Sequence, residues 1–280
     1  MGAFLERLAS AGRPPLWLEA TSYAGRLFTG GAIPWRDPTT FVAWQRKVQA
    51  LLKSAVVALP LAAVIDDWLA AHADLTSAMA TKQRPLFPLK TLLADASLRT
   101  HVVELTRNLR ASFADVPLAL TAPSPRAWLG RAHAQAHGAH EPVQIGNDDA
   151  DTAAMYMADF LRAFGNGGID VLLLEETVAT QPASREEIEC YRPVLNIASH
   201  YRWDLGLHWV VGGGIDLEGS GIDFAIAPHA LDVRTGVVVR DDFWAGAAAP
   251  EVRGGGFYFA EIPEHAQPER VLDRLAVLRG

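Results

Sequence analysis

The sequence predicts an α/β protein, a (β/α)₈ TIM barrel that residues 1–280 form as one domain. Two observations predict this fold. About eight short apolar runs alternate with helix-sized stretches along the chain. The runs are continuously apolar, which is typical of parallel strands covered on both faces. A doubly wound open sheet is the alternative, but no G-x-G-x-x-G follows the first run, which weakens its dinucleotide-binding form.

The strand candidates are short apolar runs that end in polar residues or proline. In chain order they are Pro15–Ala20, Ala55–Ile65, Val116–Thr121, Ile169–Leu174, Gly206–Val211, Ile222–Ala227, Gly236–Arg240 and Phe257–Ile262. The clearest is Ile169–Leu174, which has the sequence IDVLLL and is followed by two glutamates. Pro60 interrupts Ala55–Ile65, and this run passes abruptly into Asp66 and Asp67. We therefore expect both aspartates at the end of the second strand.

The helix candidates place apolar residues at helical spacing. They are Thr39–Leu52, Leu92–Phe113 as one or two helices, Asp151–Phe164, Glu186–His200 and Pro268–Leu278. Asp37 and Pro38 precede the first of them, which is a sequence pattern for a helix start. Gly167 and Gly168 stop the third, as glycines commonly do at helix ends. This order of elements predicts a helix-sized connection after most strands.

Composition limits the function classes. Lys plus Arg is 25 and Asp plus Glu is 32, a formal net charge of −7, which argues against a nucleic-acid surface. The single cysteine, Cys190, excludes an intramolecular disulfide and a zinc site of several thiolates. No apolar run reaches the length of about 18 residues needed to span a membrane. We expect a cytoplasmic protein with a small-molecule substrate, and a homodimer remains open.

In a TIM barrel the active site lies where the strands end. The polar residues expected there are Glu19, Tyr23, Arg26, Asp66, Asp67, Ser124, Arg126, Glu175, Glu176, His208, His229, Arg240, Asp241, Asp242 and Glu261. A carboxylic acid in such a low-dielectric mouth can act as an acid or a base. We expect the eight tryptophans to fill the core and rim. His133 and His137, four apart, are expected on a solvated helix face.

Several segments, in order along the chain, resemble uroporphyrinogen decarboxylase. Arg13–Leu18 and Ala24–Arg26 resemble its R-P-P-V-W and R-Q-A-G-R motifs, and Ala62–Leu69 resembles A-A-I-I-F-S-D-I-L. Further matches, each to a strand or helix start of that family, are Leu118–Leu129, Gly167–Glu176, Ile222–Pro228 and Pro268–Val271. The chain therefore resembles the superfamily of uroporphyrinogen decarboxylases, cobalamin-independent methionine synthases and corrinoid-linked methyltransferases, which implies a TIM barrel enzyme.

The resemblance implies a set of site residues. The central catalytic aspartate of the family falls on Asp67, with Asp66 behind it. We expect Arg26 to hold a substrate carboxylate and Glu176 and Glu261 to complete the catalytic group. Substrate-binding residues are expected to be Glu19, Tyr23, Arg126, Glu175, His208, His229 and Asp241. The implied reaction is a cofactor-free decarboxylation of a small organic acid or a pyrrole-like molecule, with no metal.

The chain also departs from the family. The last strand lacks the family's N-L-G-H-G histidine, since the stretch here is Tyr258–Pro263, so we do not expect a tetrapyrrole substrate. The methyltransferase branch holds zinc through His-x-Cys and a later Cys, and this chain has no His-x-Cys. A methyltransferase working on a thiol or a corrinoid partner is the alternative function, with zinc as its alternative cofactor. Such a zinc ion would be held by His200, His208, His229 and a carboxylate. A non-catalytic ligand-binding barrel is the third.

Overall fold

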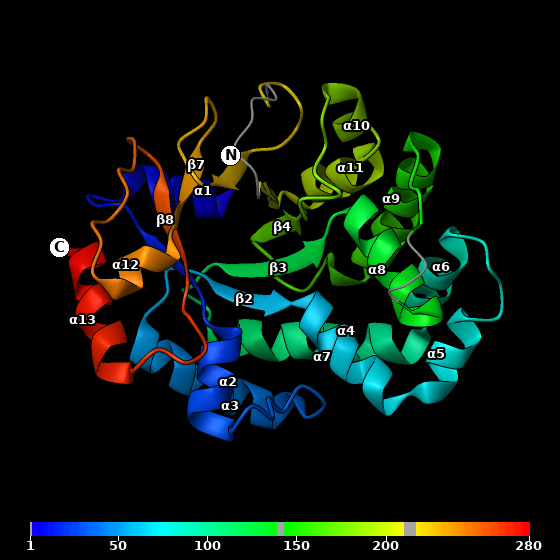
Figure 1. Ribbon diagram of the computed structural model, residues 1–280, viewed down its shortest axis with the longest axis horizontal. Helices are drawn as coiled ribbons and strands as arrows, with labels where there is room; N and C mark the ends of the chain where they lie inside the picture. The colour runs from blue at the N-terminus through cyan, green and yellow to red at the C-terminus, as the bar shows by residue number, and fades with distance from the viewer. Residues whose placement is uncertain (1, 139–142, 210–216) are drawn as a thin grey trace.

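The computed structural model describes residues 2–138, 143–209 and 217–280, and its strands curl into a nearly closed parallel barrel (Figure 1). The eight strands found in these ranges are β1 Leu16–Glu19, β2 Val57–Pro60, β3 Leu118–Pro123, β4 Val171–Glu175, β5 Asp204–His208, β6 Phe224–Ala227, β7 Thr235–Val239 and β8 Phe257–Glu261. They are hydrogen-bonded in the order β1-β8-β7-β6-β5-β4-β3-β2, and every pair is parallel. The predicted TIM barrel is confirmed.

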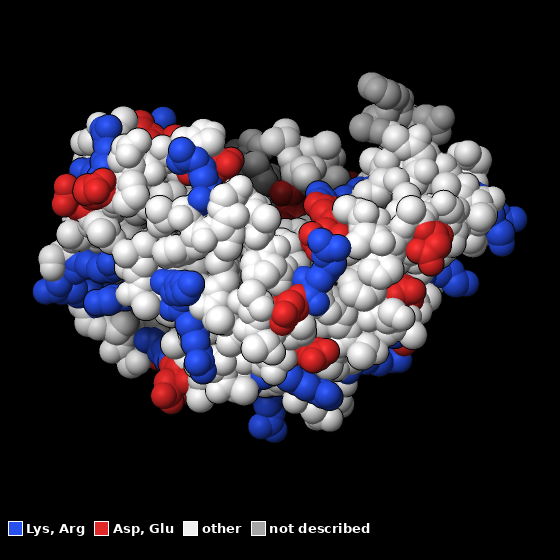
Figure 2. Space-filling view, turned by 90° about the horizontal axis from the view of Figure 1, so that it is seen from below, with Lys and Arg blue, Asp and Glu red and all other residues white. Residues whose placement is uncertain are grey.

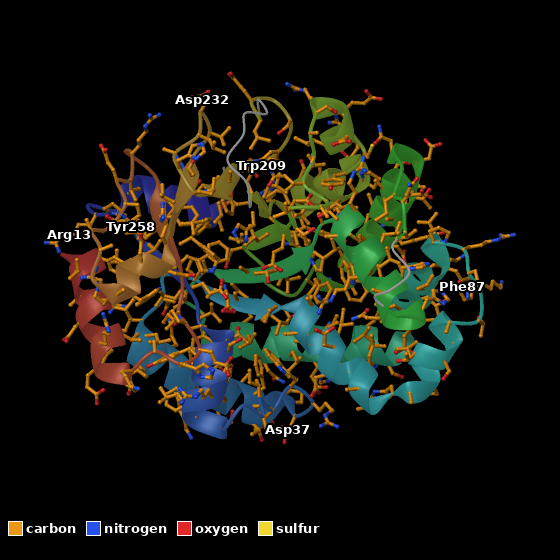
Figure 3. All side chains as sticks on the ribbon, viewed as in Figure 1. Arg13, Asp37, Phe87, Trp209, Asp232 and Tyr258 are labelled. Atoms are coloured by element: carbon orange, nitrogen blue, oxygen red, sulfur yellow. The ribbon has the colours of Figure 1, made fainter. Side chains whose placement is uncertain are left out.

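Helices lie outside the strands and connect them. They are α1 Ala3–Ser10, α2 Thr21–Thr29, α3 Pro38–Leu52, α4 Leu61–Ala71, α5 Ala73–Met79, α6 Leu86–Ala94, α7 Ala96–Ser112, α8 Pro125–His137, α9 Asn147–Leu161, α10 Arg185–Glu189, α11 Arg192–Tyr201, α12 Asp241–Ala245 and α13 Pro268–Arg279. The predicted start of α3 is confirmed. Asp37, at the lower edge of Figure 3, accepts hydrogen bonds from the backbone N–H groups of Thr39 and Thr40, both at 3.0 Å.

The second predicted strand is wrong in its extent. Only Val57–Pro60 pairs as a strand, Ala55 and Val56 precede it, and Leu61–Ile65 forms the first half of α4. An apolar run alone does not distinguish a buried strand from a buried helix, and here the helix begins directly after Pro60. Asp66 and Asp67 therefore lie on the second turn of α4 instead of at a strand end.

Three other predicted elements differ from the structure in their bounds. Leu92–Phe113 divides at Asp95, whose carboxylate caps α7 by accepting from Leu98 N–H at 2.6 Å. Glu186–His200 divides into α10 and α11. Strand β5 ends at His208, so the predicted Gly206–Val211 extends too far, and its last two residues lie outside the described ranges. His208, the last residue of β5, therefore lies at the barrel mouth.

Helix α1 closes the end of the barrel opposite the mouth. Phe4 is 2% exposed, and its ring lies 5.7, 5.4 and 5.7 Å from the rings of Trp17, Phe224 and Phe257. The Asp204 carboxylate caps the helix by accepting from the backbone N–H of Gly2 at 2.8 Å and of Leu5 at 3.1 Å. Aromatic rings thus fill the end of the barrel next to α1. The mouth lies at the other end, where the strands have their carboxyl ends.

The barrel has a seam between β1 and β2, which are not paired as strands. One backbone bond crosses it, from Ala55 N–H to Leu16 O at 2.8 Å. The Ser54 hydroxyl replaces part of the missing ladder, because it accepts from Leu18 N–H at 3.0 Å and from Val56 N–H at 3.4 Å. The seam leaves backbone polar groups of two strands facing each other across a gap, beneath α3.

Positive and negative side chains are interspersed on the face of the molecule that Figure 2 shows. The ion pairs of the described residues include Arg131 with Asp66 and, at 2.7 Å, Arg99 with Asp159. Among the helices of the described ranges, none combines the length and apolar character needed to cross a membrane.

Candidate active site

Three carboxyl groups and one imidazole belong to the last residues of four strands, at positions that face the inside of the barrel. Alternate residues of a strand face the same side, and Trp17, Leu173 and Phe259 belong to the cluster inside the barrel. The residues two positions further along are Glu19, Glu175 and Glu261. Glu19 and Glu261 are register partners on β1 and β8, and Glu175 and His208 are register partners on β4 and β5. These four side chains form the mouth, a name used below for this group.

Within the mouth, the carboxyl pKa of Glu175 bears most directly on a possible reaction. Burial, followed by repulsion from Glu19, raises the pKa of its carboxyl to about 7. The Thr121 hydroxyl and the more distant Arg131 oppose this rise only in part. A carboxyl group with a pKa near 7 exchanges protons readily at neutral pH, which is the property of a general acid or base.

Glu19 shares this environment. Burial, followed by a smaller repulsion from Glu261, raises the pKa of its carboxyl, although it accepts from the backbone N–H of Thr21 at 2.9 Å. Because Glu19 and Glu175 repel each other, the mouth favours a state in which one of them holds a proton.

His208 is uncharged at neutral pH. Burial alone lowers the pKa of its imidazole to about 4, and its ring lies 5.1 Å from the ring of Phe259. A neutral imidazole can both accept and donate a hydrogen bond. The mouth thus combines a half-ionised carboxyl with an uncharged base.

Glu176 belongs to a second, separate cluster behind β4. Its carboxylate is 5% exposed and accepts three hydroxyl hydrogen bonds, from Ser124 at 2.7 Å, Tyr191 at 2.7 Å and Thr180 at 2.8 Å. Burial raises the pKa of this carboxyl to about 7, and the three hydrogen bonds oppose the rise. Consecutive strand residues face opposite sides, so Glu176 faces the helices and Glu175 faces the barrel. The cluster fixes β4 to α8, α11 and the loop after β4.

Asp66 and Asp67 are engaged in ion pairs, Asp66 with α8 and Asp67 with the segment before α3. The Asp66 carboxylate pairs with Arg131 and accepts from Gln135 at 2.8 Å. Asp67 lies 3.1 Å from the Arg36 Nε atom. The structure therefore does not bring the two aspartates into the four-residue mouth, and their catalytic roles stay predictions.

The remaining predicted site residues do not belong to the four-residue mouth. Arg26 is exposed on α2 and donates to Glu264 O at 3.4 Å. Tyr23 is buried on the same helix, where burial raises the pKa of its hydroxyl. Arg126 is 8% exposed and ties α8 to the following segment through Ile145 O at 3.1 Å and the Asn147 side chain. His229 and Asp241 are exposed after β6 and β7.

A cavity of about 60 Å³ extends from the mouth through the β1–β2 seam to α3. Its wall includes Glu19, Glu175 and Thr121 from the strands and Gln45 and Gln49 from α3. Five aromatic side chains complete it: Trp17, Trp35, Phe41, Trp44 and Phe259. A second groove, lined by Lys82, Phe87 and Lys90 among others, is separate from the mouth, and Figure 3 shows Phe87 at the far edge of the molecule.

Sequence reasoning missed part of this arrangement. Thr121 was expected to end the third strand, and nothing marked it as a partner of Glu175. Three of the tryptophans expected as core filler, Trp17, Trp35 and Trp44, also line the cavity. The pattern of polar residues after apolar runs found Glu19, Glu175, His208 and Glu261, but the open seam follows from pairing that no local pattern encodes.

The residues do not fit the zinc site of the alternative function. Across 2–138, 143–209 and 217–280, no three His, Cys, Asp or Glu side chains are grouped so as to hold a metal ion. His200 lies on α11, before β5, and His208 ends that strand, so the two lie at opposite ends of the barrel. Cys190 follows α10, and its thiol donates to Glu186 O at 3.5 Å.

Comparisons with known proteins agree on the fold. No protein-family model and no curated protein matches the chain. Among solved structures, the methyltransferase from Methanosarcina mazei is 16% identical with a TM-score of 0.63, covering 99% of this chain and 96% of that chain. The carboxyl transferase domain of Rhizobium etli pyruvate carboxylase with 3-hydroxypyruvate is 10% identical with a TM-score of 0.51, covering 98% of this chain and 48% of that chain.

This chain thus spans about half of the carboxyl transferase structure and nearly the whole of the methyltransferase. At such identities the likeness shows the fold alone. The protein is a TIM barrel whose fold is similar over nearly its whole length to that of the methyltransferase from Methanosarcina mazei.

Proposed function

We propose that this protein is an enzyme that binds a small molecule at the mouth and transfers a proton through Glu175. One observation carries the proposal. Glu175 is the last residue of β4 and faces the inside of the barrel at the mouth. Burial raises the pKa of its carboxyl to about 7. Strongly shifted carboxyl groups in a cleft are typical of catalytic acids and bases.

The reaction proposed is a cofactor-free decarboxylation, by a divergent member of the uroporphyrinogen decarboxylase-like superfamily. The bond between the substrate carbon and its carboxylate breaks, and the electron pair passes into the π system of the substrate. Carbon dioxide leaves, and the protonated Glu175 carboxyl gives its proton to the same carbon. Glu19 and Glu261 lie near this carbon, and their negative charge disfavours the substrate carboxylate relative to the neutral carbon dioxide that leaves.

The first experiment incubates the protein in D₂O with 3-oxo acids and with pyrrole and arene carboxylates, each of which can accept the electron pair. NMR then follows release of carbon dioxide and incorporation of one deuterium. We expect turnover of one class and its loss in Glu175→Gln, with Glu264→Gln, an exposed glutamate after β8, as the matched control. Full activity of Glu175→Gln would overturn the assignment of the acid. Saturable binding without turnover would favour a non-catalytic barrel.

The second candidate is a methyltransferase, and the observation that favours it is the near full-length structural match to one. Such an enzyme transfers a methyl group to a thiol, and zinc commonly activates the thiol. The described side chains do not form a zinc site. Elemental analysis of untagged protein separates the two candidates. About one zinc per chain, lost with activity on chelation, supports the methyltransferase, and active zinc-free protein supports the decarboxylase.

A further inference from the structure

The cavity in the β1–β2 seam has an unusual combination of walls. Among the residues that the structure describes, Glu19 and Glu175 are the charged side chains of its lining, and no lysine or arginine lines it. The remaining wall is mainly aromatic and aliphatic. Carboxyl groups attract a cation, and the faces of tryptophan and phenylalanine rings stabilise it further. An anion would meet repulsion from both glutamates and no compensating positive charge.

The aromatic wall is a packed assembly. The rings of Trp35 and Phe41 lie 4.9 Å apart, and those of Phe41 and Trp44 lie 5.7 Å apart in a stacked arrangement. Their packing fixes the rings before any ligand enters. A preformed wall lowers the entropy cost of binding.

Trp44 provides an independent indication of a ligand. Its side chain is 5% exposed, it lines the cavity, and its indole N–H has no hydrogen-bond partner in the part of the chain that the structure describes. A buried donor without a partner costs free energy, so such groups are usually satisfied by water or a ligand. This N–H can donate to a ligand oxygen, whereas the two carboxyl groups can accept from an ammonium group.

We propose that this cavity binds a small ammonium ligand that also carries a hydroxyl or carbonyl oxygen. The ammonium group lies at Glu19 and Glu175, and the oxygen accepts from the Trp44 indole. The cavity volume of about 60 Å³ limits the bound group to about four or five water-sized atoms. The inference deepens the proposed function by naming the substrate class, a carboxylate that also carries an ammonium group: the cavity would hold the ammonium part, and the carboxylate that is lost would lie outside the cavity. It rests on the proposed function only for the claim that the ligand reacts.

The test uses three probes of four non-hydrogen atoms each: ethanolammonium, neutral ethylene glycol and anionic acetate. Calorimetric titration of the full chain is made in about 0.1 M KCl, which screens long-range attraction to the acidic protein. We expect saturable binding of ethanolammonium, at least about tenfold weaker binding of ethylene glycol and no binding of acetate. Equal binding of the neutral probe, tighter binding of acetate, or no binding of ethanolammonium would overturn the proposal.

Two variants locate the binding. Glu19→Gln should weaken ethanolammonium binding about tenfold or more, and Trp44→Phe, which keeps a ring and removes the N–H, should weaken it severalfold. Glu264→Gln changes the same charge outside the cavity and should bind like the wild type. If circular dichroism shows that Glu19→Gln does not fold, the affinity of Trp44→Phe alone tests where the ligand binds. Unchanged affinity in the folded variants would show that the ligand does not bind in the seam cavity.

The binding result is independent of turnover. If ethanolammonium binds as expected but Glu175→Gln keeps full activity, the proposed acid is wrong and the ammonium site remains. If Glu175→Gln abolishes activity and no ammonium probe binds, the proposed function remains and the substrate class is wrong.

Discussion

Glu175 and His208 end neighbouring parallel strands in the same register, and burial shifts the pKa values of their side chains in opposite directions, to about 7 and to about 4. Desolvation disfavours the charged form of each group, so the carboxyl gains protons and the imidazole loses them. Near pH 7 the carboxyl is therefore about half protonated, and the imidazole is uncharged. A proton donor and a proton acceptor stand side by side without an ion pair that would neutralise both.

The first prediction concerns the pH dependence of turnover. If protonated Glu175 is the acid, kcat/KM should be highest below pH 7 and should fall as the pH rises through about 7. His208, whose pKa is about 4, should add no transition near pH 6.5. Rates of substrate decarboxylation from pH 5 to 9 measure the profile. A profile that rises through pH 7 would make Glu175 a base.

The second prediction ranks two carboxyl groups. Glu175→Gln should lower kcat by about 10²- to 10⁴-fold, the usual contribution of a general acid or base. Asp67→Asn, the substitution that tests the family resemblance, should have a smaller effect, because the Asp67 carboxylate already pairs with Arg36. Both are measured on the same substrate after a check of folding. The reverse order would place the chemistry on α4.

The third prediction concerns Glu176 and the pH dependence of stability. Its folded pKa of about 7 lies above the model-peptide value, so the folded state binds more protons between about pH 4.5 and 7. Stability from this group is present at acidic pH and is lost as the pH rises through 7. Glu176→Gln cannot ionise and should flatten this decline in melting temperature from pH 5 to 8. An unchanged slope would show that the carboxyl is not shifted.

The fourth prediction concerns the hydroxyl beneath Glu176. Ser124 is fully buried, caps α8 by accepting from Ala127 N–H at 3.2 Å and donates to Glu176. Ser124→Ala removes both interactions and should destabilise the fold by about 1–3 kcal/mol. Urea unfolding measures the change. A loss below about 0.5 kcal/mol would show that water replaces the hydroxyl at no cost.

The fifth prediction tests the closure of the barrel by α1. Phe4→Ala should cost about 3–5 kcal/mol, because its ring is buried among Trp17, Phe224 and Phe257 and leaves a cavity when removed. Leu272→Ala, on the exposed side of α13 at 40% exposure, should change stability by less than about 0.5 kcal/mol. Equal effects in urea unfolding would show that α1 is not part of the folded core.

Most strands could be predicted because each is a short, continuously apolar run with a polar or proline end. Ile169–Leu174 and Phe257–Ile262 were found within two residues of β4 and β8. The failure at Ala55–Ile65 has a physical cause, since apolar residues line both β2 and the buried face of α4. Because of that error, Asp66 and Asp67 were expected at the end of a strand, whereas they lie on α4.

The sequence by itself determined the barrel and the chemical nature of its mouth. Alternating apolar and amphipathic segments require a parallel sheet covered by helices, and residues after such strands meet at one end. Only the tertiary structure decided which of those residues meet. Register across β4 and β5 pairs Glu175 with His208, burial sets their protonation, and the unpaired β1–β2 seam opens a cavity beside Trp44. Register, burial and closure depend on contacts between distant segments, which no local pattern specifies.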